Sequence, residues 1–336
     1  MRDGDILILT GGEVGALLAG REAQVVDAVR RAYLAHSRGE SSLPHSSFLR
    51  FPAAPNNRVI ALPAYLGGEF GAAGIKWIAS FPGNLERGLD RASAAVILNS
   101  AETGRPFAFM EGSVISARRT AASAALAALG LRAAEETDSL SIVGCGPINF
   151  EVVRFVLGLL PDVGRLHIYD TDPARAQQFS ANCRRSFGGL EVSVARAVEP
   201  VLESSPLISI ATTAAVPHIG DLSRCRRGST ILHVSLRDLS AEAILASDNV
   251  VDDVDHVCRA QTSVHLAEQL SGGRDFIRCT LADVLLSRSR KPDPDRVTVF
   301  SPFGLGVLDL AVALFAYQLS LEQKVGTVVE SFLPTA

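Results

Sequence analysis

The feature that most constrains this fold is a series of short apolar segments after Ser139, each separated from the next by a stretch with helical periodicity. These segments are rich in Val, Ile and Leu and are short enough to be buried strands. They are Leu140–Val143, Leu166–Tyr169, Glu191–Val194, Leu207–Ala211, Thr230–Val234, Val250–Val251 and Val297–Phe300. Alternating strands and helices are typical of a parallel sheet with helices on both faces. This part of the chain therefore predicts a doubly wound α/β domain of the Rossmann type.

The first third of the chain has a different pattern, in which apolar residues recur at every second position. After a strand at Ile6–Leu9 and helices up to residue 38, five segments look like antiparallel strands. They are Phe48–Phe51, Arg58–Leu62, Gly74–Phe81, Ala94–Leu98 and Phe107–Met110. The turn residues of Asn99–Gly104 suit a hairpin between the last two. These segments predict an α+β domain with an antiparallel sheet.

The length of 336 residues is about twice the usual size of one domain, so two domains are expected. An Ala-rich helix from Ser113 to Leu131 leads from the antiparallel strands toward the parallel ones, and we place the boundary on it. The predicted domains are residues 1–115 and the Rossmann domain 116–304. An apolar helix at Leu305–Leu321 would bring residues 305–336 back onto the first domain.

Composition excludes several classes of function. The formal net charge of −4 and the absence of a run rich in Lys and Arg argue against nucleic acid or a membrane surface as partner. Small molecules are the expected partners. The five cysteines are scattered without a CxxC pair, which predicts neither a disulfide framework nor a metal site and suggests a reducing compartment. The acidic N-terminus is unlike a signal peptide, and the apolar stretches are too short to cross a bilayer, so we expect a cytoplasmic protein.

A glycine pair, Gly144 and Gly146, follows a predicted buried strand and precedes a helix that begins near Pro147 and Ile148. Glycines allow a tight turn and a close approach of a pyrophosphate, which the free amides and dipole of the following helix stabilise. Pro147 suits the first helical turn, where its missing amide would be unpaired anyway. An ordinary strand-to-helix turn would look similar, because Asn149 replaces the third glycine of the dinucleotide-binding pattern.

The end of the next strand supplies a second signal. Asp170 lies there, where dinucleotide-binding domains place the carboxylate that accepts the ribose hydroxyls. A carboxylate at this point repels a 2′-phosphate, so NAD is favoured over NADP. Thr212 and Thr213 end another strand at the same edge and could line the nicotinamide side, although plain loop capping explains either threonine equally well. Together these residues predict an NAD site.

Lys76 stands in an apolar strand of the first domain. Burying an ammonium group is costly unless the group is paired or its pKa is altered. Lys76 therefore either extends its amine to solvent or serves a site, and the residues alone leave both interpretations open.

The order of several motifs resembles the ornithine cyclodeaminase/mu-crystallin family. The matching residues are Gly74, Lys76, Pro82 and Asn84; Thr103 and Gly104; Arg119, Thr120 and Ala122; and Gly144 and Gly146. Two later segments, Val234–Asp238 and Ser301–Asp309, are similar to the family's catalytic-aspartate loop and to its last motif. The likeness extends from residue 40 to residue 315, nearly the whole chain.

This resemblance implies a role for each matched residue. Lys76 would polarise or hydrogen-bond the reacting group, Arg119 would bind the α-carboxylate through two parallel hydrogen bonds, and Asp238 would handle protons and water at an imine. Ser235 and Gly304, in the two later segments, would contact the cofactor. The resemblance also implies a homodimer whose subunits pair through the sheets of their first domains.

One departure from the family concerns its upstream carboxylate-binding arginine. The chain has Leu43–Ser46 where that arginine belongs. Either His45 or the nearby Arg50 takes the role, and Arg91 is a further candidate for an anionic group.

Within the family, Lys76–Asn84 and Arg91–Ser93 resemble a branch that uses NAD to cleave an N-substituted glutamate oxidatively. The products of that branch are 2-oxoglutarate and 2,3-diaminopropionate, a siderophore or antibiotic precursor. Its substrate carries three carboxylates, which suits several arginines. One alternative is an ornithine-type cyclodeaminase that recycles its NAD, and another is a mu-crystallin-like protein that binds a nicotinamide cofactor and a small ligand without turnover. Lys76, Arg119 and Asp238 together favour an enzyme, a dehydrogenase acting on a CH–NH bond.

Overall fold

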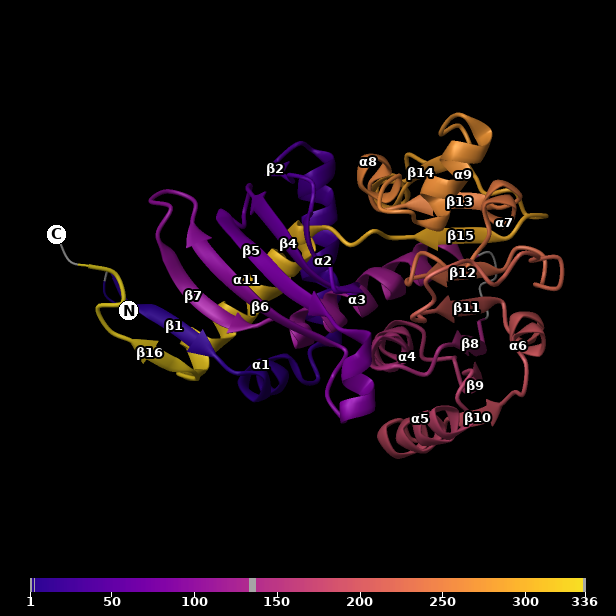
Figure 1. The fold of residues 1–336 in the computed structure, drawn as a ribbon, viewed down its shortest axis with the longest axis horizontal. Coiled ribbons are helices and arrows are strands. Elements are labelled where there is room, and N and C mark those ends of the chain that lie inside the picture. Colours follow the sequence, from indigo (N-terminus) through magenta and orange to yellow (C-terminus); the bar gives the residue numbers. More distant parts are fainter. Residues whose placement is uncertain (1, 3, 133–136, 335–336) are drawn as a thin grey trace. The chain divides into compact units, whose positions relative to one another are not determined.

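The computed structural model describes residues 2, 4–132 and 137–334. The chain divides into two compact units, Met1–Arg119 with Leu305–Ala336 (unit 1) and Thr120–Gly304 (unit 2) (Figure 1). The division falls inside helix α3 (Ser113–Leu131), the helix on which the sequence places the boundary. Each unit has its own sheet.

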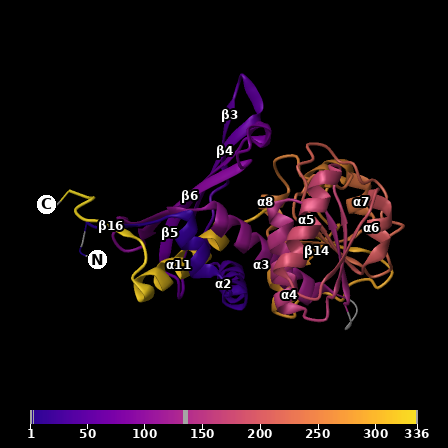
Figure 2. The same cartoon turned by 90° about the horizontal axis from the view of Figure 1, so that it is seen from below.

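Unit 2 contains an eight-stranded sheet in the order β10-β9-β8-β11-β12-β15-β13-β14, and all neighbouring strands are parallel. The strands are β8 (Ser139–Val143), β9 (Arg165–Tyr169), β10 (Glu191–Val194), β11 (Leu207–Ile210), β12 (Thr230–His233), β13 (Asp248–Val251), β14 (Ile277–Thr280) and β15 (Thr298–Ser301). The helices are α4 (Pro147–Leu159), α5 (Pro173–Ser186), α6 (Val198–Ser204), α7 (Ala241–Leu245), α8 (Val254–Val257), α9 (Ser263–Ser271) and α10 (Leu281–Leu285). The predicted Rossmann-type sheet is confirmed, with helices on both faces (Figure 2).

The strand order in unit 2 reverses between β8 and β11. From β8 the chain first adds β9 and β10 on one side and then crosses to β11 on the other. Open α/β sheets bind ligands at the carboxyl ends of their strands where the order reverses. Gly144 follows β8 and Thr212 closely follows β11, so two of the predicted cofactor segments meet at this point.

Unit 1 contains a second eight-stranded sheet, in the order β16-β1-β7-β6-β5-β4-β2, with β3 paired to β4. Its strands are β1 (Ile6–Leu9), β2 (Ser41–Ser42), β3 (Ser47–Phe51), β4 (Ala54–Leu66), β5 (Ala72–Ser80), β6 (Ala92–Ser100), β7 (Pro106–Glu111) and β16 (Thr327–Val329). Strands β3 to β7 pair antiparallel as predicted. Strand β2, which was not predicted, also pairs antiparallel with β4, whereas β1 runs parallel to β7. The sheet is therefore mixed. Its helical elements are α1 (Gly11–Leu18), α2 (Glu22–Ser37), the 3₁₀ helix η1 (Pro82–Arg87) and α11 (Gly306–Gln323).

One face of the unit 1 sheet is covered by α11, which packs against β4, β5 and β6 as well as α2. Alternate residues of a strand point to opposite faces, so Gly74 and Lys76 of β5 share one. A Cβ added to Gly74 would lie 3.0 Å from the Leu310 side chain, which shows that this shared face is the one under α11. Because α11 is buried on nearly all sides, its Asp309 is buried too, directly over Lys76.

Candidate active site

Three charged side chains meet inside unit 1. The Lys76 ammonium donates to Oδ2 of Asp309 at 2.7 Å and to the Ser116 hydroxyl at 3.1 Å. Nε of Arg119, six residues into α3, donates to the other oxygen, Oδ1, at 2.9 Å. The side chains of Lys76, Asp309 and Arg119 are 2%, 0% and 11% exposed. Lys76 therefore does not extend to solvent, and β5, α3 and α11 together build a closed charged cluster.

The cluster holds more positive than negative charge. Burial lowers the pKa of Lys76 to about 8, the nearby Arg119 guanidinium lowers it as well, and Asp309 partly opposes both. When Lys76 is protonated, two cations face a single carboxylate. Among the described residues only Nε of Arg119 is engaged, which leaves its two Nη groups for a second carboxylate. This arrangement suits Arg119 as an anion-binding residue.

The remaining predicted substrate residues of unit 1 lie farther along the sheet. Arg91 donates from Nη1 to the Ser80 hydroxyl at 2.8 Å, and burial lowers the Arg91 pKa. Ser80 lies on the same face of β5 as Lys76, four residues on, which corresponds to about 13 Å along the strand. Arg50 pairs with Arg58 near that same end of the sheet and is exposed. His45 is exposed in the segment between β2 and β3.

In unit 2, the loop after β8 has the geometry of a phosphate-binding turn. Gly144 has φ of +91°, and an added Cβ would lie 2.5 Å from the Ala211 carbonyl oxygen. Gly146 caps α4, and Pro147 occupies the first helical turn as predicted. Apart from its two chain neighbours, no heavy atom of the described residues lies within 4 Å of the position that a Cβ on Gly146 would take, so a ligand can approach the backbone there. Ile148 follows within the first turn, half-buried.

Asn149 stands in place of the third glycine and stabilises the loop with its side-chain hydrogen bonds. It is fully buried, and its Nδ2 donates to the carbonyl oxygens of Val143 and Gly144 at 3.0 and 2.7 Å. Its Oδ1 accepts from the Ser209 hydroxyl of β11 at 2.7 Å. The side chain therefore ties the glycine loop to two neighbouring strands. A polar residue at a helix position that must face the sheet was the available signal in the sequence.

Asp170 lies at the predicted place but is already engaged. Its Oδ2 accepts from the Cys145 amide at 2.8 Å, and its Oδ1 accepts from the Asp172 amide at 2.9 Å and from Arg175 at 3.2 Å. The carboxylate thus fixes the glycine loop from the side, and a ribose hydroxyl would share an oxygen with these donors. The role of Asp170 in binding ribose stays a prediction.

Asp238 lies in the loop after β12 and is 0% exposed. The hydroxyls of Thr212 and Ser235 donate to its two oxygens, and Nε2 of His218 lies 3.1 Å from Oδ1. Nε2 of a second histidine, His233, is 3.4 Å from Oδ2. The predicted catalytic aspartate and two predicted cofactor residues therefore form one hydrogen-bonded group, whereas neither histidine was predicted.

The last two predicted cofactor residues lie at the same edge of the sheet. Gly304 has φ of +91°, and its amide donates to Asp252 at 2.7 Å. Burial raises the pKa of Asp252, and its hydrogen bonds from backbone amides oppose that rise. Thr213 is exposed beside Thr212. Across the described residues, no group of three or more His, Cys, Asp or Glu side chains could hold a metal ion, and no helix is long and apolar enough to span a bilayer.

A Rossmann-type sheet with a glycine loop, combined with a mixed sheet that buries a lysine, an arginine and an aspartate, defines a two-unit α/β protein. Residues 7–324 match the sequence profile of the ornithine cyclodeaminase/mu-crystallin family. The chain belongs to that family, as the order of its motifs predicted.

Individual relatives match over nearly their full length. N-((2S)-2-amino-2-carboxyethyl)-L-glutamate dehydrogenase of Staphylococcus aureus is 28% identical over 323 residues, which cover 93% of this chain and 95% of that protein. The structure of Thermococcus litoralis Δ(1)-pyrroline-2-carboxylate reductase with NADH and L-proline has a TM-score of 0.88 at 26% identity, covering 96% and 99% of the two chains. An archaeal alanine dehydrogenase dimer with bound NAD has a TM-score of 0.85 at 26% identity, covering 97% and 99%.

Proposed function

We propose that this chain is the dehydrogenase that cleaves N-(2-amino-2-carboxyethyl)-L-glutamate to 2,3-diaminopropionate and 2-oxoglutarate. The broader class, an oxidoreductase that acts on a CH–NH bond with a nicotinamide cofactor, is confirmed by the family and by the relatives above. The Staphylococcus aureus relative is a dehydrogenase of the same compound. What we add to this confirmed class is the identity of the substrate.

NAD as the cofactor agrees with the relatives that bind NAD or NADH. The backbone of unit 2 fits it, because the open space at Gly146 admits a pyrophosphate to the N-terminus of α4. Asp170 stands where ribose hydroxyls would be accepted. When bound, NAD supplies the hydride acceptor, and the side chains of the protein bind and orient the substrate and move its protons.

The observation that supports this choice of substrate is the spacing of positively charged groups along the face of β5 that bears Lys76 and Ser80. Arg119 and Lys76 form one anion-binding place, and Arg91 lies toward Ser80, about 13 Å along the strand. A small amino acid with a single carboxylate would use the first place alone. An extended substrate with carboxylates at both ends would use both places, and the long Arg91 side chain shortens the gap between them. This favours a tricarboxylate over alanine or proline.

The proposed reaction is an oxidation followed by a hydrolysis. The C–H bond at the glutamate α-carbon breaks, its hydride passes to NAD⁺, and the nitrogen loses a proton, which leaves an imine. Water then adds to the imine carbon and the C–N bond breaks. The products are 2-oxoglutarate, 2,3-diaminopropionate, NADH and one proton. Arg119 holds the α-carboxylate through these steps, and Lys76 donates a hydrogen bond beside it.

The exposed face of the unit 1 sheet supports the predicted homodimer. Tyr65, Trp77 and Phe109 point away from α11 and are 40%, 46% and 42% exposed. Large apolar side chains gathered on one sheet face are typical of a surface that pairs with another protein. We propose that a second copy of the chain covers this face, as the dimeric archaeal relative suggests.

Product analysis tests the function. Incubation with N-(2-amino-2-carboxyethyl)-L-glutamate and NAD⁺ is expected to give one NADH per 2-oxoglutarate, and L-ornithine is expected to give little proline. Ammonia and proline from ornithine, with absorbance at 340 nm unchanged, would instead establish a cyclodeaminase. No turnover of either compound by protein that binds NAD would indicate a binding protein.

A further inference from the structure

Unit 2 holds a histidine beside Asp238 that no motif assigned. His218 lies in the loop after β11, and besides its ring contact, its backbone amide donates to the Asp238 carbonyl oxygen at 2.9 Å. The Ile219 amide donates to that same oxygen at 2.9 Å, and the Ser240 amide returns a bond to the Ile219 carbonyl at 2.9 Å. Two loops from different strands are therefore joined by both backbone and side chain.

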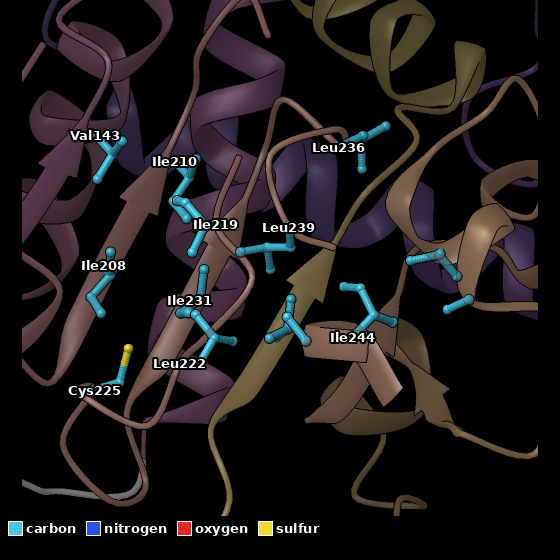
Figure 3. Close-up of a cluster of buried hydrophobic side chains, with 14 of the residues drawn as sticks. Val143, Ile208, Ile210, Ile219, Leu222, Cys225, Ile231, Leu236, Leu239 and Ile244 are labelled. Carbon is cyan, nitrogen blue, oxygen red and sulfur yellow. The ribbon is translucent and has the colours of Figure 1, made fainter. Parts of the chain in front are cut away.

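Apolar packing fixes these two loops. Ile219 and Leu239 are 4% and 0% exposed and belong to one hydrophobic cluster, together with Leu236 (Figure 3). Leu236 has φ of +69°, a conformation that costs a non-glycine residue energy and persists only where its surroundings impose it. The histidine and the aspartate are thus held in place before any ligand binds.

The two side chains differ in access to solvent. The Asp238 side chain is 0% exposed, and hydroxyls from Thr212 and Ser235 occupy its oxygens. The His218 side chain is 40% exposed, and its Nδ1 makes no hydrogen bond with any residue that the structure describes. Water or a substrate at this surface meets the imidazole and not the carboxylate.

The charge on the Asp238 carboxylate also favours His218 as the group that takes up a proton. Burial raises the pKa of Asp238, but the hydrogen bonds from His218 and its other neighbours outweigh burial and hold that pKa well below its usual range. A carboxylate of this kind seldom holds a proton. It does stabilise a positive charge on a neighbouring imidazole. The other titratable ring at this carboxylate, His233, accepts from the Asp238 amide at Nε2 and faces Ser301 at Nδ1.

We propose that His218 is the catalytic base of this enzyme and that Asp238 is its positioning residue. The inference rests on the proposed function, because that reaction needs a group to take a proton from water. As the water oxygen bonds to the imine carbon, an O–H bond breaks and the proton passes to Nδ1 of neutral His218. The imidazolium keeps its Nε2 proton on Asp238. It gives the Nδ1 proton to the imine nitrogen, which completes a carbinolamine. In the next step the O–H bond of the carbinolamine breaks, its proton passes through Nδ1 of His218 to the amine nitrogen, and the C–N bond breaks as the C=O bond forms.

The first experiment compares His218→Gln with His265→Gln, a half-buried histidine of α9 whose ring contacts Gln269 instead of Asp238. Glutamine can still donate to Asp238 but cannot take up a proton. In His218→Gln, kcat should fall about 100-fold or more while KM and NAD affinity change by less than about threefold. The rise of kcat with pH in the unmutated enzyme should also disappear. Added imidazole should restore part of the activity of His218→Ala, and His265→Gln should behave like the unmutated enzyme.

A second experiment needs no substrate. Ring NMR of the NAD⁺-bound protein records the Nε2 proton of His218, whose resonance should move in Asp238→Asn because its charged hydrogen-bond partner is lost. If the unmutated enzyme fails to oxidise the proposed substrate but this shift appears, the proposed function fails and the pairing stands. The proposal itself is overturned if folded His218→Gln keeps its kcat and its pH dependence. It is equally overturned if kcat falls with the pH dependence unchanged and no rescue by imidazole.

Discussion

Two fully buried aspartates, Asp309 in unit 1 and Asp238 in unit 2, have opposite surroundings. Asp309 faces the Arg119 guanidinium and the Lys76 amine, whose pKa burial lowers to about 8. Asp238 faces hydroxyls and imidazole rings, which are neutral or gain charge only on protonation. Both carboxylates are satisfied, but by different chemistry. In the proposed reaction, the first arrangement fixes charges for binding, and the second allows a proton to move.

The largest expected difference is in stability. Asp309→Asn leaves two buried cations without a counterion and should lower the unfolding free energy by about 3 to 5 kcal/mol. Asp238→Asn keeps an amide that its neutral neighbours can still hydrogen-bond, and should cost about 1 to 2 kcal/mol. Urea unfolding of the two variants measures both values. Equal losses of unfolding free energy would show that Asp309 is not the counterion of two buried cations.

Removal of Arg119 should have the next largest effect, and on activity. Arg119→Ala leaves the substrate carboxylate desolvated without its two-bond partner, a loss of about 2 to 5 kcal/mol in transition-state binding. Arg119→Lys should recover only part of it because the planar fork is lost. Steady-state kinetics of both variants supply the numbers. A folded Arg119→Ala enzyme with unchanged kcat/KM would remove Arg119 from the site.

The glycine loop of unit 2 offers a matched pair of substitutions. Gly144→Ala must place a Cβ 2.5 Å from a backbone oxygen at a positive φ, so it should destabilise the fold by about 2 kcal/mol or more. Gly146→Ala meets open space at an ordinary φ and should fold normally. It should nevertheless weaken NAD binding at least about tenfold, because its methyl group occupies the approach of the pyrophosphate. Melting curves and cofactor titration separate the two effects, and unchanged NAD affinity in Gly146→Ala would place the cofactor elsewhere.

The pKa of Lys76 predicts the alkaline side of the pH profile. Because that pKa is lowered to about 8, the ammonium form is present below pH 8 and is lost as pH rises through that value. If Lys76 acts as a donor to the substrate, kcat/KM falls over the same range. Asp309 raises this pKa, so Asp309→Asn should move the fall to lower pH by about one unit. A profile that stays flat to pH 10 would show that the charge on Lys76 is not required.

The smallest expected effect concerns cofactor choice. Asp170→Ser removes the carboxylate that pairs with Arg175 and leaves that guanidinium beside the place of a 2′-phosphate. The preference for NAD over NADP should narrow by about tenfold, and Arg175→Ala in the same background should reverse the gain for NADP. Equal affinities for both cofactors in the unmutated protein would contradict the assignment of Asp170.

The parallel sheet could be predicted from the sequence because its strands are short apolar segments separated by segments with helical periodicity. It missed β14, a half-buried edge strand that contains Arg278, and it missed β16, which is mostly exposed. The direction of β1 could not be read because no turn joins it to β7. Strand pairing cannot be predicted from the sequence where neither an apolar pattern nor a turn indicates it.

The same limit applies to the site. Lys76 was recognisable as a charge in an apolar strand, but its partner Asp309 is 233 residues away. His218 gave no signal at all, because a histidine in a loop is usually a surface residue and only the pairing of two loops brings it to Asp238. Asn149 could be recognised as a polar residue in place of the third glycine, but its hydrogen-bond partners in the neighbouring strands could not be predicted. The motifs in the sequence identified Lys76 and Asp238 as candidate site residues, but only the structure shows which side chains bond to them.

In the proposed reaction, the hydride leaves the substrate permanently. The direct measurement uses N-(2-amino-2-carboxyethyl)-L-glutamate with deuterium on the glutamate α-carbon, together with NAD⁺, and follows the label by mass spectrometry. We expect one deuterium in each NADH formed and none in 2-oxoglutarate or 2,3-diaminopropionate. Unlabelled nicotinamide, with deuterium kept in or returned to an amino-acid product, would contradict it.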